Sequence, residues 1–337
     1  MGSIDLSIVI VNYKTPQLTH DCVASIHEFT QGLSFEVIVV DNQSEDESKD
    51  VILGAFPNTV WVDNGDNAGT SRGYNAGVRN SKGAYVLILN SDTVIKSNVF
   101  KESMDAYQAL EEKGKVGMYS CQLKGFDNEI QFNSNISFPT LRKFVQANPF
   151  FIKFIKPQKI RLSFEEKMEL HQRDHEACWI GIAFGLINAK IFKEEQLYFD
   201  EDIFMYSDEV EWCLRLNKLG YKHYFSAQHC IFHINSGSST SFSGWRAGQI
   251  TLSEWLYFMK IEGKMKFTFM TLLILFNHFL DSLFTLKSKV LGKTPESEKS
   301  ALETRKMELE LIRKYFFKIL FNYKKTPSTA KTYLKYE

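Results

Sequence analysis

Short apolar runs recur along the first part of the chain and alternate with segments whose apolar residues have helical spacing. Runs rich in Val, Ile and Leu are typical of strands that are covered on both faces. We predict four such strands, at residues 6–13, 35–42, 59–62 and 84–90. Because strands and helices alternate, the pattern predicts a mostly parallel α/β sheet flanked by helices.

The segments between these runs carry signals for helix starts. Thr15 and Pro16 predict a helix, with Thr as the N-cap and Pro at the first helical position. Residues 69–80 predict a second helix. Ser97 predicts the cap of a third helix, because the apolar residues that follow it recur at helical spacing.

All four predicted strands end in polar residues or lead into them. In open parallel sheets, ligands bind beyond the carboxyl ends of the strands. We therefore expect a polar ligand at this edge of the sheet. The candidate binding residues are Asn12, Tyr13, Asp41, Asn42, Asn67, Gly69, Arg72, Gly73, Asn75, Asn90, Ser91 and Asp92.

The residue types at this edge indicate the kind of ligand. Asp41 can accept hydrogen bonds from a planar base or from a ribose diol, and Arg72 offers a planar fork for phosphate. Asp92 follows a buried strand and suits Mg²⁺ or Mn²⁺, which bind carboxylate together with substrate phosphates. Taken singly, such residues are also common in turns and helix caps. Their shared edge favours the joint interpretation.

The second half of the chain adds candidates for catalysis. Asp208, Glu209 and Glu211 lie within one turn of a predicted helix, and one of them could act as a general base toward a substrate hydroxyl. The alternative is an acidic helix start that the helix dipole stabilises. His233 follows a strand-like run and is either structural or a second metal ligand beside Asp92.

Two tryptophans are candidates on the side of the site that would receive this hydroxyl, the acceptor side, together with Glu211. Trp179 and Trp212 could stack on a substrate ring, although buried tryptophans usually belong to the core.

Composition excludes some classes of protein. The 337 residues have a formal net charge of zero, which argues against bulk nucleic-acid binding. Residues 256–337 nevertheless contain 16 Lys and Arg against 8 Asp and Glu, so a basic tail follows an acidic body. The five cysteines are scattered without a CxxC pair, which predicts buried thiols in a reducing cytosol. The N-terminal run is expected to be a strand and not a signal peptide.

Two segments depart from the strand–helix alternation. Residues 138–175 have no clear periodicity, and we expect an insertion or loop beside the site. Residues 267–286 are long enough to span a bilayer but contain Asn277, His278 and Asp281, which are costly at its centre. Flanking lysines favour an interfacial helix at a membrane surface. Packing on the body or in a homodimer is the alternative.

Five stretches in this order resemble family 2 glycosyltransferases with the GT-A fold, of the bacterial rhamnosyltransferase-like type. They are "SIVIVNYK", "VIVVDNQSED", "DNAGTSRGYNAGVRNSKGAYVLILNSDT", "FDEDIFMYSDEVEWCLRLNKLGY" and "FHINSGSS". The resemblance covers about residues 6–239. We therefore expect a catalytic domain at residues 1–245 and a helical, basic and aromatic appendage at residues 246–337.

The resemblance assigns roles by position in these motifs. Asn90-Ser91-Asp92 stands where the family has its Asp-x-Asp metal motif, and Asp208-Glu209 stands where it has a Glu-Asp pair. It implies that Asp92 and His233 bind a divalent cation, that Glu209 is the catalytic base with Asp208 in reserve, and that the sheet-edge residues bind the nucleotide-sugar.

The implied activity is inverting, metal-dependent transfer of a sugar from dTDP-rhamnose or a UDP-sugar to a hydroxyl of a glycan. The basic tail suggests an acceptor linked to polyprenyl diphosphate, in surface polysaccharide biosynthesis at the cytoplasmic face of the cell membrane. One alternative is a non-catalytic, membrane-associated assembly subunit with this fold. A sugar nucleotidyltransferase is less favoured, because no glycine-rich triphosphate loop follows the first strand.

Overall fold

The structure is a computed structural model that describes residues 4–141, 162–234, 243–290, 297–324, 327 and 333–336. Part of the expected insertion, residues 142–161, lies outside the described residues, as do residues 235–239 of the last motif.

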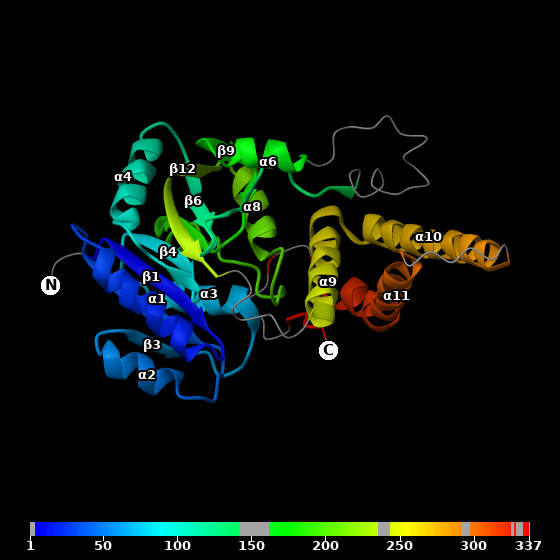
Figure 1. The fold of residues 1–337 in the computed structure, drawn as a ribbon, viewed down its shortest axis with the longest axis horizontal. Coiled ribbons are helices and arrows are strands. Elements are labelled where there is room, and N and C mark those ends of the chain that lie inside the picture. The colour runs from blue at the N-terminus through cyan, green and yellow to red at the C-terminus, as the bar shows by residue number, and fades with distance from the viewer. Residues whose placement is uncertain are drawn as a thin grey trace.

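A mixed sheet runs through the body of the molecule in the order β3-β2-β1-β4-β11-β6-β12-β5 (Figure 1). The first four strands are parallel, and they are β3 (Val60–Asp63), β2 (Phe35–Asp41), β1 (Leu6–Asn12) and β4 (Tyr85–Asn90). This half of the sheet confirms the predicted strands to within a residue or two, and it confirms the expected α/β class.

The other half of the sheet mixes strand directions. β11 (Phe184–Asn188) is antiparallel to β4, whereas β6 (Val116–Lys124) and β12 (Lys222–His233) are parallel to each other. Shorter strands complete the structure: β5 (Thr93–Val94) and β9 (His175–Ala177) on β12, β7 (Ile130–Gln131) on β6, and β8 (Ser134–Asn135) paired with β10 (Trp179–Ile180).

Helices cover both faces of the sheet. Successive side chains of β1 point to opposite faces, so each face has an apolar core. Leu6, Ile8 and Ile10 pack with α1 (Pro16–Phe29), α2 (Ser48–Ala55) and α4 (Val99–Glu111). Val9 packs on the other face with α3 (Gly69–Asn80), α7 (Lys190–Lys193) and α8 (Asp208–Lys218). The resulting three layers place the ends of β1, β2 and β4 at a common edge.

Of two predicted helix starts, one is confirmed and the other is wrong in detail. Thr15 is the N-cap residue of α1 and Pro16 its first residue, as predicted, although the Thr15 hydroxyl caps no backbone N–H and donates to Asn12 Oδ1 at 3.1 Å. The N-cap of α4 is Asn98 and not Ser97, and the Asn98 amide binds the backbone of Gln31.

The expected loop at residues 138–175 is also partly wrong. α6 (Phe164–Leu170) lies within it and begins with a capping box, in which Ser163 and Glu166 satisfy each other's backbone N–H groups. The sequence S-x-x-E at residues 163–166 carried this signal.

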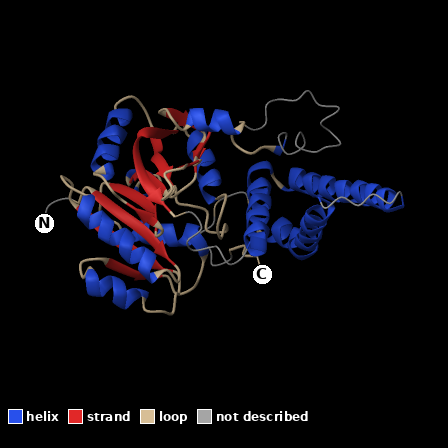
Figure 2. Ribbon diagram, viewed as in Figure 1, coloured by secondary structure: helices blue, strands red, loops and turns tan. Residues whose placement is uncertain are grey.

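The C-terminal part is helical and stands to one side of the sheet (Figures 1 and 2). It contains α9 (Ser243–Glu262), α10 (Lys264–Val290) and α11 (Ser297–Asn322). Trp255, Phe267 and Tyr315 form a core between these helices, and Ile203 and Val210 of the body belong to the same core. The domain boundary near residue 245 stays a prediction.

A buried lysine joins the helical part to the body. Lys260 Nζ of α9 lies 2.6 Å from Asp200 Oδ2 and 2.6 Å from Asp202 Oδ2, and its side chain is fully buried. Ser253 of α9 also donates to the carbonyl oxygen of Met205 at 2.7 Å. The segment that leads into α8 is therefore held by α9.

Within the described residues, no helix has both the length and the apolar character that crossing a bilayer requires.

Candidate active site

Asp92 and His233 meet because a short strand pairing brings their segments together. After β4 the chain turns, and β5 pairs with the end of β12, with Thr93 opposite His233. Asp92 Oδ1 then lies 3.2 Å from His233 Nε2, and Asn90 Nδ2 lies 3.4 Å from the same nitrogen. The structure thus brings the two predicted metal ligands into direct contact.

Carboxylate oxygen and imidazole nitrogen are ligands that Mn²⁺ and Mg²⁺ sites use, so the residue types fit a divalent cation. Among the described residues, no group of three or more His, Cys, Asp or Glu side chains gathers at a possible metal site. A cation at Asp92 and His233 would therefore take its remaining ligands from phosphate and water, as Mg²⁺ usually does.

The acid pair starts α8 after two strained residues. Tyr206 and Ser207 have φ values of 66° and 62°, a left-handed conformation that costs energy for residues other than glycine. Asp208 is buried, and its Oδ2 accepts hydrogen bonds from Thr70 at 2.8 Å and from Ser71 at 3.4 Å. The start of α8 is thereby fixed against the start of α3.

Glu209 is partly exposed beside Asp208. Burial of its carboxyl raises its pKa well above the usual value, and the charge and hydrogen bond of Asp208 raise it further. A carboxyl group with a raised pKa at a site edge is a candidate general base.

Tyr74 of α3 is influenced both by the acid pair and by Asp92. Burial raises its pKa well above 10, and the charges of Asp208, Glu209 and Asp92 all contribute in the same direction. Asp92 and the acid pair are therefore both near enough to Tyr74 to act on the same phenol. Asp92 and His233 together are called the metal edge below, after their predicted role.

Asn12 holds Asp41 in place through a hydrogen bond, and its own side chain is inaccessible to solvent. Its Nδ2 donates to Asp41 Oδ1 at 2.8 Å, and its Oδ1 accepts from Thr15 and from Thr19. Ser44 completes the arrangement with hydrogen bonds from its hydroxyl and its backbone N–H to Asp41. Asn12 is fully buried, so the predicted direct contact with a nucleotide is replaced by a positioning role.

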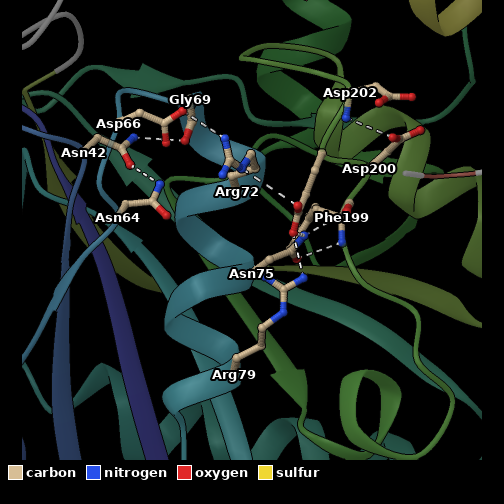
Figure 3. A network of polar contacts seen from close by, with 11 residues as sticks. Asn42, Asn64, Asp66, Gly69, Arg72, Asn75, Arg79, Phe199, Asp200 and Asp202 are labelled. Atoms are coloured by element: carbon tan, nitrogen blue, oxygen red, sulfur yellow. Dashed lines mark hydrogen bonds and ion pairs between the residues drawn. The ribbon is translucent and has the colours of Figure 1, made fainter. Parts of the chain in front are cut away.

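The loop after β3 is pinned by asparagine side chains (Figure 3). Asn42 Nδ2 donates to the Gly69 carbonyl at 3.0 Å, and Asn64 donates to Asn42 Oδ1 at 2.8 Å. Gly69 has a φ of 83°, and a Cβ at this position would lie 1.7 Å from the carbonyl oxygen of Phe204. Only glycine allows α3 to begin against this segment.

One face of α3 binds Glu201, a residue that the sequence reasoning missed. Glu201 Oε1 accepts from Asn75 at 2.9 Å and from Arg79 at 2.7 Å, and Arg72 Nε lies 3.9 Å from Oε2. The spacing of these three residues along one helix face could have indicated an acidic partner.

Asn75 was predicted to contact the nucleotide, but its side chain points into the protein. It is fully buried, and its amide binds the backbone N–H and C=O of Phe199 as well as Glu201. Arg72 is mostly buried and paired with Asp66 at 3.2 Å, so its guanidinium already has a carboxylate partner.

Two predicted acceptor-side residues are also structural. Trp212 is fully buried, stacks on Phe192 and Phe199, and donates to the Leu197 carbonyl at 2.7 Å. Glu211 is buried and forms a 2.7 Å ion pair with Arg215. Neither has a face open to a sugar.

The remaining candidates differ in exposure. Tyr13 is exposed, Ser91 and Gly73 are buried, and Trp179 and Asn67 are partly buried. Gly73 lets α3 pack closely on β1, since a Cβ there would lie 2.7 Å from Val11.

A cavity of about 920 Å³ opens beside the metal edge. Asn90 and His233 line it on one side, and residues of the β6–β7 region line it on the other, among them Phe126, Asp127, Glu129, Gln131 and Phe132. Aromatic, acidic and amide side chains together suit a ligand rich in hydroxyl groups.

Comparison with known proteins shows what the chain is similar to. Two relatives are similar in sequence. The low-salt glycan biosynthesis hexosyltransferase Agl10 of Haloferax volcanii is 26% identical over 218 residues, which are 64% of this chain and 62% of that protein. Glycosyltransferase GlyG of Streptococcus pneumoniae is 33% identical over 112 residues, 32% of this chain and 36% of that protein. The chain thus matches less than two thirds of the length of either relative.

A solved structure has the same fold. The mannosyltransferase PcManGT of Pyrobaculum calidifontis, in complex with GDP-Man and Mn²⁺, superposes with a TM-score of 0.53 and 10% identity. The match covers 94% of this chain and 88% of that one. The family model for glycosyl transferase family 2 matches residues 7–164, which hold the β1, β2 and β4 edge and Asp92. Over these residues the chain is similar to family 2 glycosyl transferases, and both relatives similar in sequence are glycosyltransferases.

Proposed function

We propose that the protein is an inverting, metal-dependent glycosyltransferase. It moves a sugar from a nucleoside-diphosphate sugar, either dTDP-rhamnose or a UDP-sugar, to a hydroxyl of a glycan. The observation that carries the proposal is the contact of Asp92 with His233 at 3.2 Å. In this proposal the acid pair Asp208 and Glu209 belongs to the same site. A nucleotide-sugar donor and Mn²⁺ occur together in PcManGT.

A divalent cation held by Asp92 and His233 would offset the negative charge that develops on the leaving nucleoside diphosphate. Asp41 and the loop at residues 64–69 form the nucleotide side of the site in this proposal. Asn12, Ser44 and Asn42 hold these groups in place through the hydrogen bonds described above.

Glu209 takes the proton from the acceptor hydroxyl. The hydroxyl oxygen forms a bond to the anomeric carbon while the bond from that carbon to the diphosphate oxygen breaks. Attack from the face opposite the diphosphate inverts the configuration, and the pair of electrons leaves with the nucleoside diphosphate. Asp208 keeps Glu209 basic by raising its pKa.

The cavity beside Asn90 and His233 holds a part of the acceptor glycan away from its reacting hydroxyl in this proposal, since Glu209 does not line it. It adjoins the metal edge, and its lining combines Phe126 and Phe132 with Asp127 and Glu129. Aromatic rings pack on the apolar faces of sugars, and carboxylates accept hydrogen bonds from their hydroxyl groups.

An exposed apolar face on α10 supports a lipid-linked acceptor. Met265, Phe269, Leu272, Phe276 and Phe279 are all exposed and recur at helical spacing. On α11, Phe317 and Phe321 are exposed, and Lys264 of α10 lies over the Phe321 ring at 5.9 Å. We propose that this apolar and basic surface binds the cytoplasmic face of the membrane, where an acceptor on polyprenyl diphosphate would lie. A homodimer that covers the same face is the alternative.

The test is a thermal-shift series with dTDP, UDP and GDP, each with and without Mn²⁺. A ligand that binds only the folded state raises Tm by mass action. We expect one nucleotide to raise Tm in a metal-dependent way, and Asp92→Ala to abolish this shift. Asp105→Ala, at an exposed ion pair on α4, is the matched control and should keep it. The absence of a shift with every nucleotide would favour a non-catalytic assembly subunit.

A further inference from the structure

Gln131 holds the ring of His233 from the side opposite Asp92. Its Oε1 lies 2.7 Å from His233 Nδ1, and its Nε2 donates to the backbone carbonyl of the same histidine at 2.8 Å. Gln131 belongs to β7 and His233 to the end of β12, so the two residues come from separate strands that both adjoin β6. One amide therefore makes two hydrogen bonds to one residue.

The donor and acceptor roles in this pair are fixed by chemistry. The His233 carbonyl can only accept, so the NH₂ end of the Gln131 amide must face it. The amide oxygen then faces Nδ1, which must carry the ring proton. In the neutral ring, Nε2 is left with its lone pair, and this is the atom that lies 3.2 Å from Asp92 Oδ1.

Two acceptor atoms lie side by side at this distance, so one cation can bind both at once. The arrangement is the one that metal-binding histidines commonly have, with the second ring nitrogen donating to a fixed oxygen that sets tautomer and orientation. Without Gln131 the ring could carry its proton on Nε2 and donate it to Asp92, which would block cation binding.

We propose that Gln131 is a positioning residue that fixes the tautomer and the orientation of His233 for a divalent cation. The proposal rests on the metal-dependent transfer proposed above. It goes beyond that activity because metal binding would depend on Gln131, a residue that is not itself a metal ligand.

The side chain of Gln131 can be changed without removing its strand. The backbone of β7 pairs with β6 through Leu123 opposite Gln131 and Lys124 opposite Ile130. Gln131→Met keeps the length of the side chain and removes both hydrogen bonds. Gln131→Glu keeps the acceptor for Nδ1 and removes the donor. Gln228→Met is the matched control, since Gln228 lies on β12 but its amide binds Asp174.

The first measurement is Mn²⁺ binding, followed by electron paramagnetic resonance of the free ion, with MnCl₂ alone and with UDP or dTDP present. We expect Gln131→Met to weaken Mn²⁺ binding by about 10- to 100-fold, the effect usual for such partners. Gln131→Glu should retain most of the affinity, and Gln228→Met should bind like the wild type. Equal affinity in the wild type and Gln131→Met would overturn the proposal, whatever the change in Tm.

The second measurement needs no metal. Long-range ¹⁵N–¹H spectra of ¹⁵N-histidine-labelled protein distinguish the tautomers, and the His233→Gln variant identifies the signal. We expect the Nδ1–H tautomer in the wild type and its loss in Gln131→Met. An Nε2–H tautomer in the wild type would overturn the proposal. If the wild type shows the expected tautomer but binds no Mn²⁺ with any nucleotide, the metal-dependent function fails and Gln131 has only a structural role.

Discussion

The two acids at the start of α8 have different surroundings, which separates their roles. Asp208 accepts hydrogen bonds from Thr70 and Ser71 and is held against α3, whereas Glu209 is partly exposed. Burial and then the neighbouring Asp208 raise the pKa of Glu209. A base with a raised pKa accepts a proton more readily, so the surroundings favour Glu209 as the base and Asp208 as the residue that tunes it.

We expect Glu209→Gln to lower kcat by about 10²- to 10⁴-fold, the usual effect of losing a general base. Asp208→Asn should lose less and should move the acidic limb of the kcat/KM profile to lower pH. The reason is that the rate rises as pH passes upward through the pKa of Glu209, and removing the Asp208 charge lowers that pKa. Release of nucleoside diphosphate measured across pH checks this. Equal losses with an unshifted profile would make Asp208 the better candidate for the base.

His223 makes stability depend on pH. Its Nδ1 accepts from the Met118 N–H and its Nε2 donates to the Cys213 carbonyl, both at 3.1 Å, so the buried ring is neutral. Burial lowers its pKa from 6.5 to about 4. The unfolded chain therefore binds more protons between these values. The contribution, about 3 kcal/mol, is complete above pH 6.5 and is lost as pH falls toward 4.

Urea unfolding at several pH values tests this expectation. The free energy of unfolding should fall more steeply between pH 6.5 and 4 for the wild type than for His223→Gln, which keeps one donor and one acceptor but does not titrate. Other histidines contribute to the slope of both proteins, so the difference between the two slopes is the measured quantity. Parallel slopes would show that His223 binds its proton equally well in the folded and unfolded states.

At the scale of single residues, the sequence predicted which kinds of residue lie near the site better than it predicted which way their side chains point. Asp92 and His233 were predicted as partners, and the structure brings them together. Asn75 and Trp212 were placed at the site, yet both side chains point into the protein. Sequence position near a strand end does not say which face of a helix a residue occupies, and Gln131 lies in a strand too short to be seen as a pattern.

At the scale of elements, two contacts position the site residues. The pairing of β5 with β12 brings Asp92 and His233 together. The contact of α3 with the Phe204 segment positions Asp208 and Glu209. The second contact is made by backbone: the Thr70 N–H donates to the Phe204 carbonyl at 2.8 Å, beside Gly69. The strands themselves were predictable from apolar runs. The pairing of β5 was not, because two residues carry no periodicity.

Gly69→Ala should therefore be far more damaging than another glycine substitution with similar backbone angles. Gly32 has a φ of 72° and open space around it, so Gly32→Ala should cost only about 1–2 kcal/mol for the left-handed conformation. Gly69→Ala adds a clash at 1.7 Å with the Phe204 carbonyl. We expect a larger loss of unfolding free energy, with a loss of nucleoside-diphosphate release. Similar losses in both variants would show that the Phe204 segment moves aside easily.

The exposed face of α10 predicts membrane binding that depends on its aromatic residues. Replacing Phe269 and Phe276 by Asp should weaken binding to vesicles with anionic phospholipids by more than tenfold, because burying one Phe contributes about 1.5–3 kcal/mol. Phe164→Asp, at an exposed phenylalanine on α6, is the control. Co-sedimentation with vesicles checks this. If the wild type does not sediment but forms a dimer that the substitutions dissociate, the dimer interpretation is correct.

At the scale of the whole molecule, the sequence predicted an α/β body and a helical basic tail, and both are present. What it did not predict is how closely the tail is joined to the site. Lys260, Asp200 and Asp202 are separated in sequence, and a charged residue in an apolar helix usually indicates an exposed position. Contacts between distant charges follow from the tertiary fold and have no local pattern.

The Lys260 contacts also set an order of events during synthesis. The ribosome releases the body first, and domains tend to fold as they emerge. Asp200 and Asp202 leave it before Lys260 does, so until α9 follows, two carboxylates in the segment that leads into α8 lack the cation that later lies between them. The nascent chain would therefore complete its sheet well before it completes its site. Catalytic competence would come only after α9 had been made.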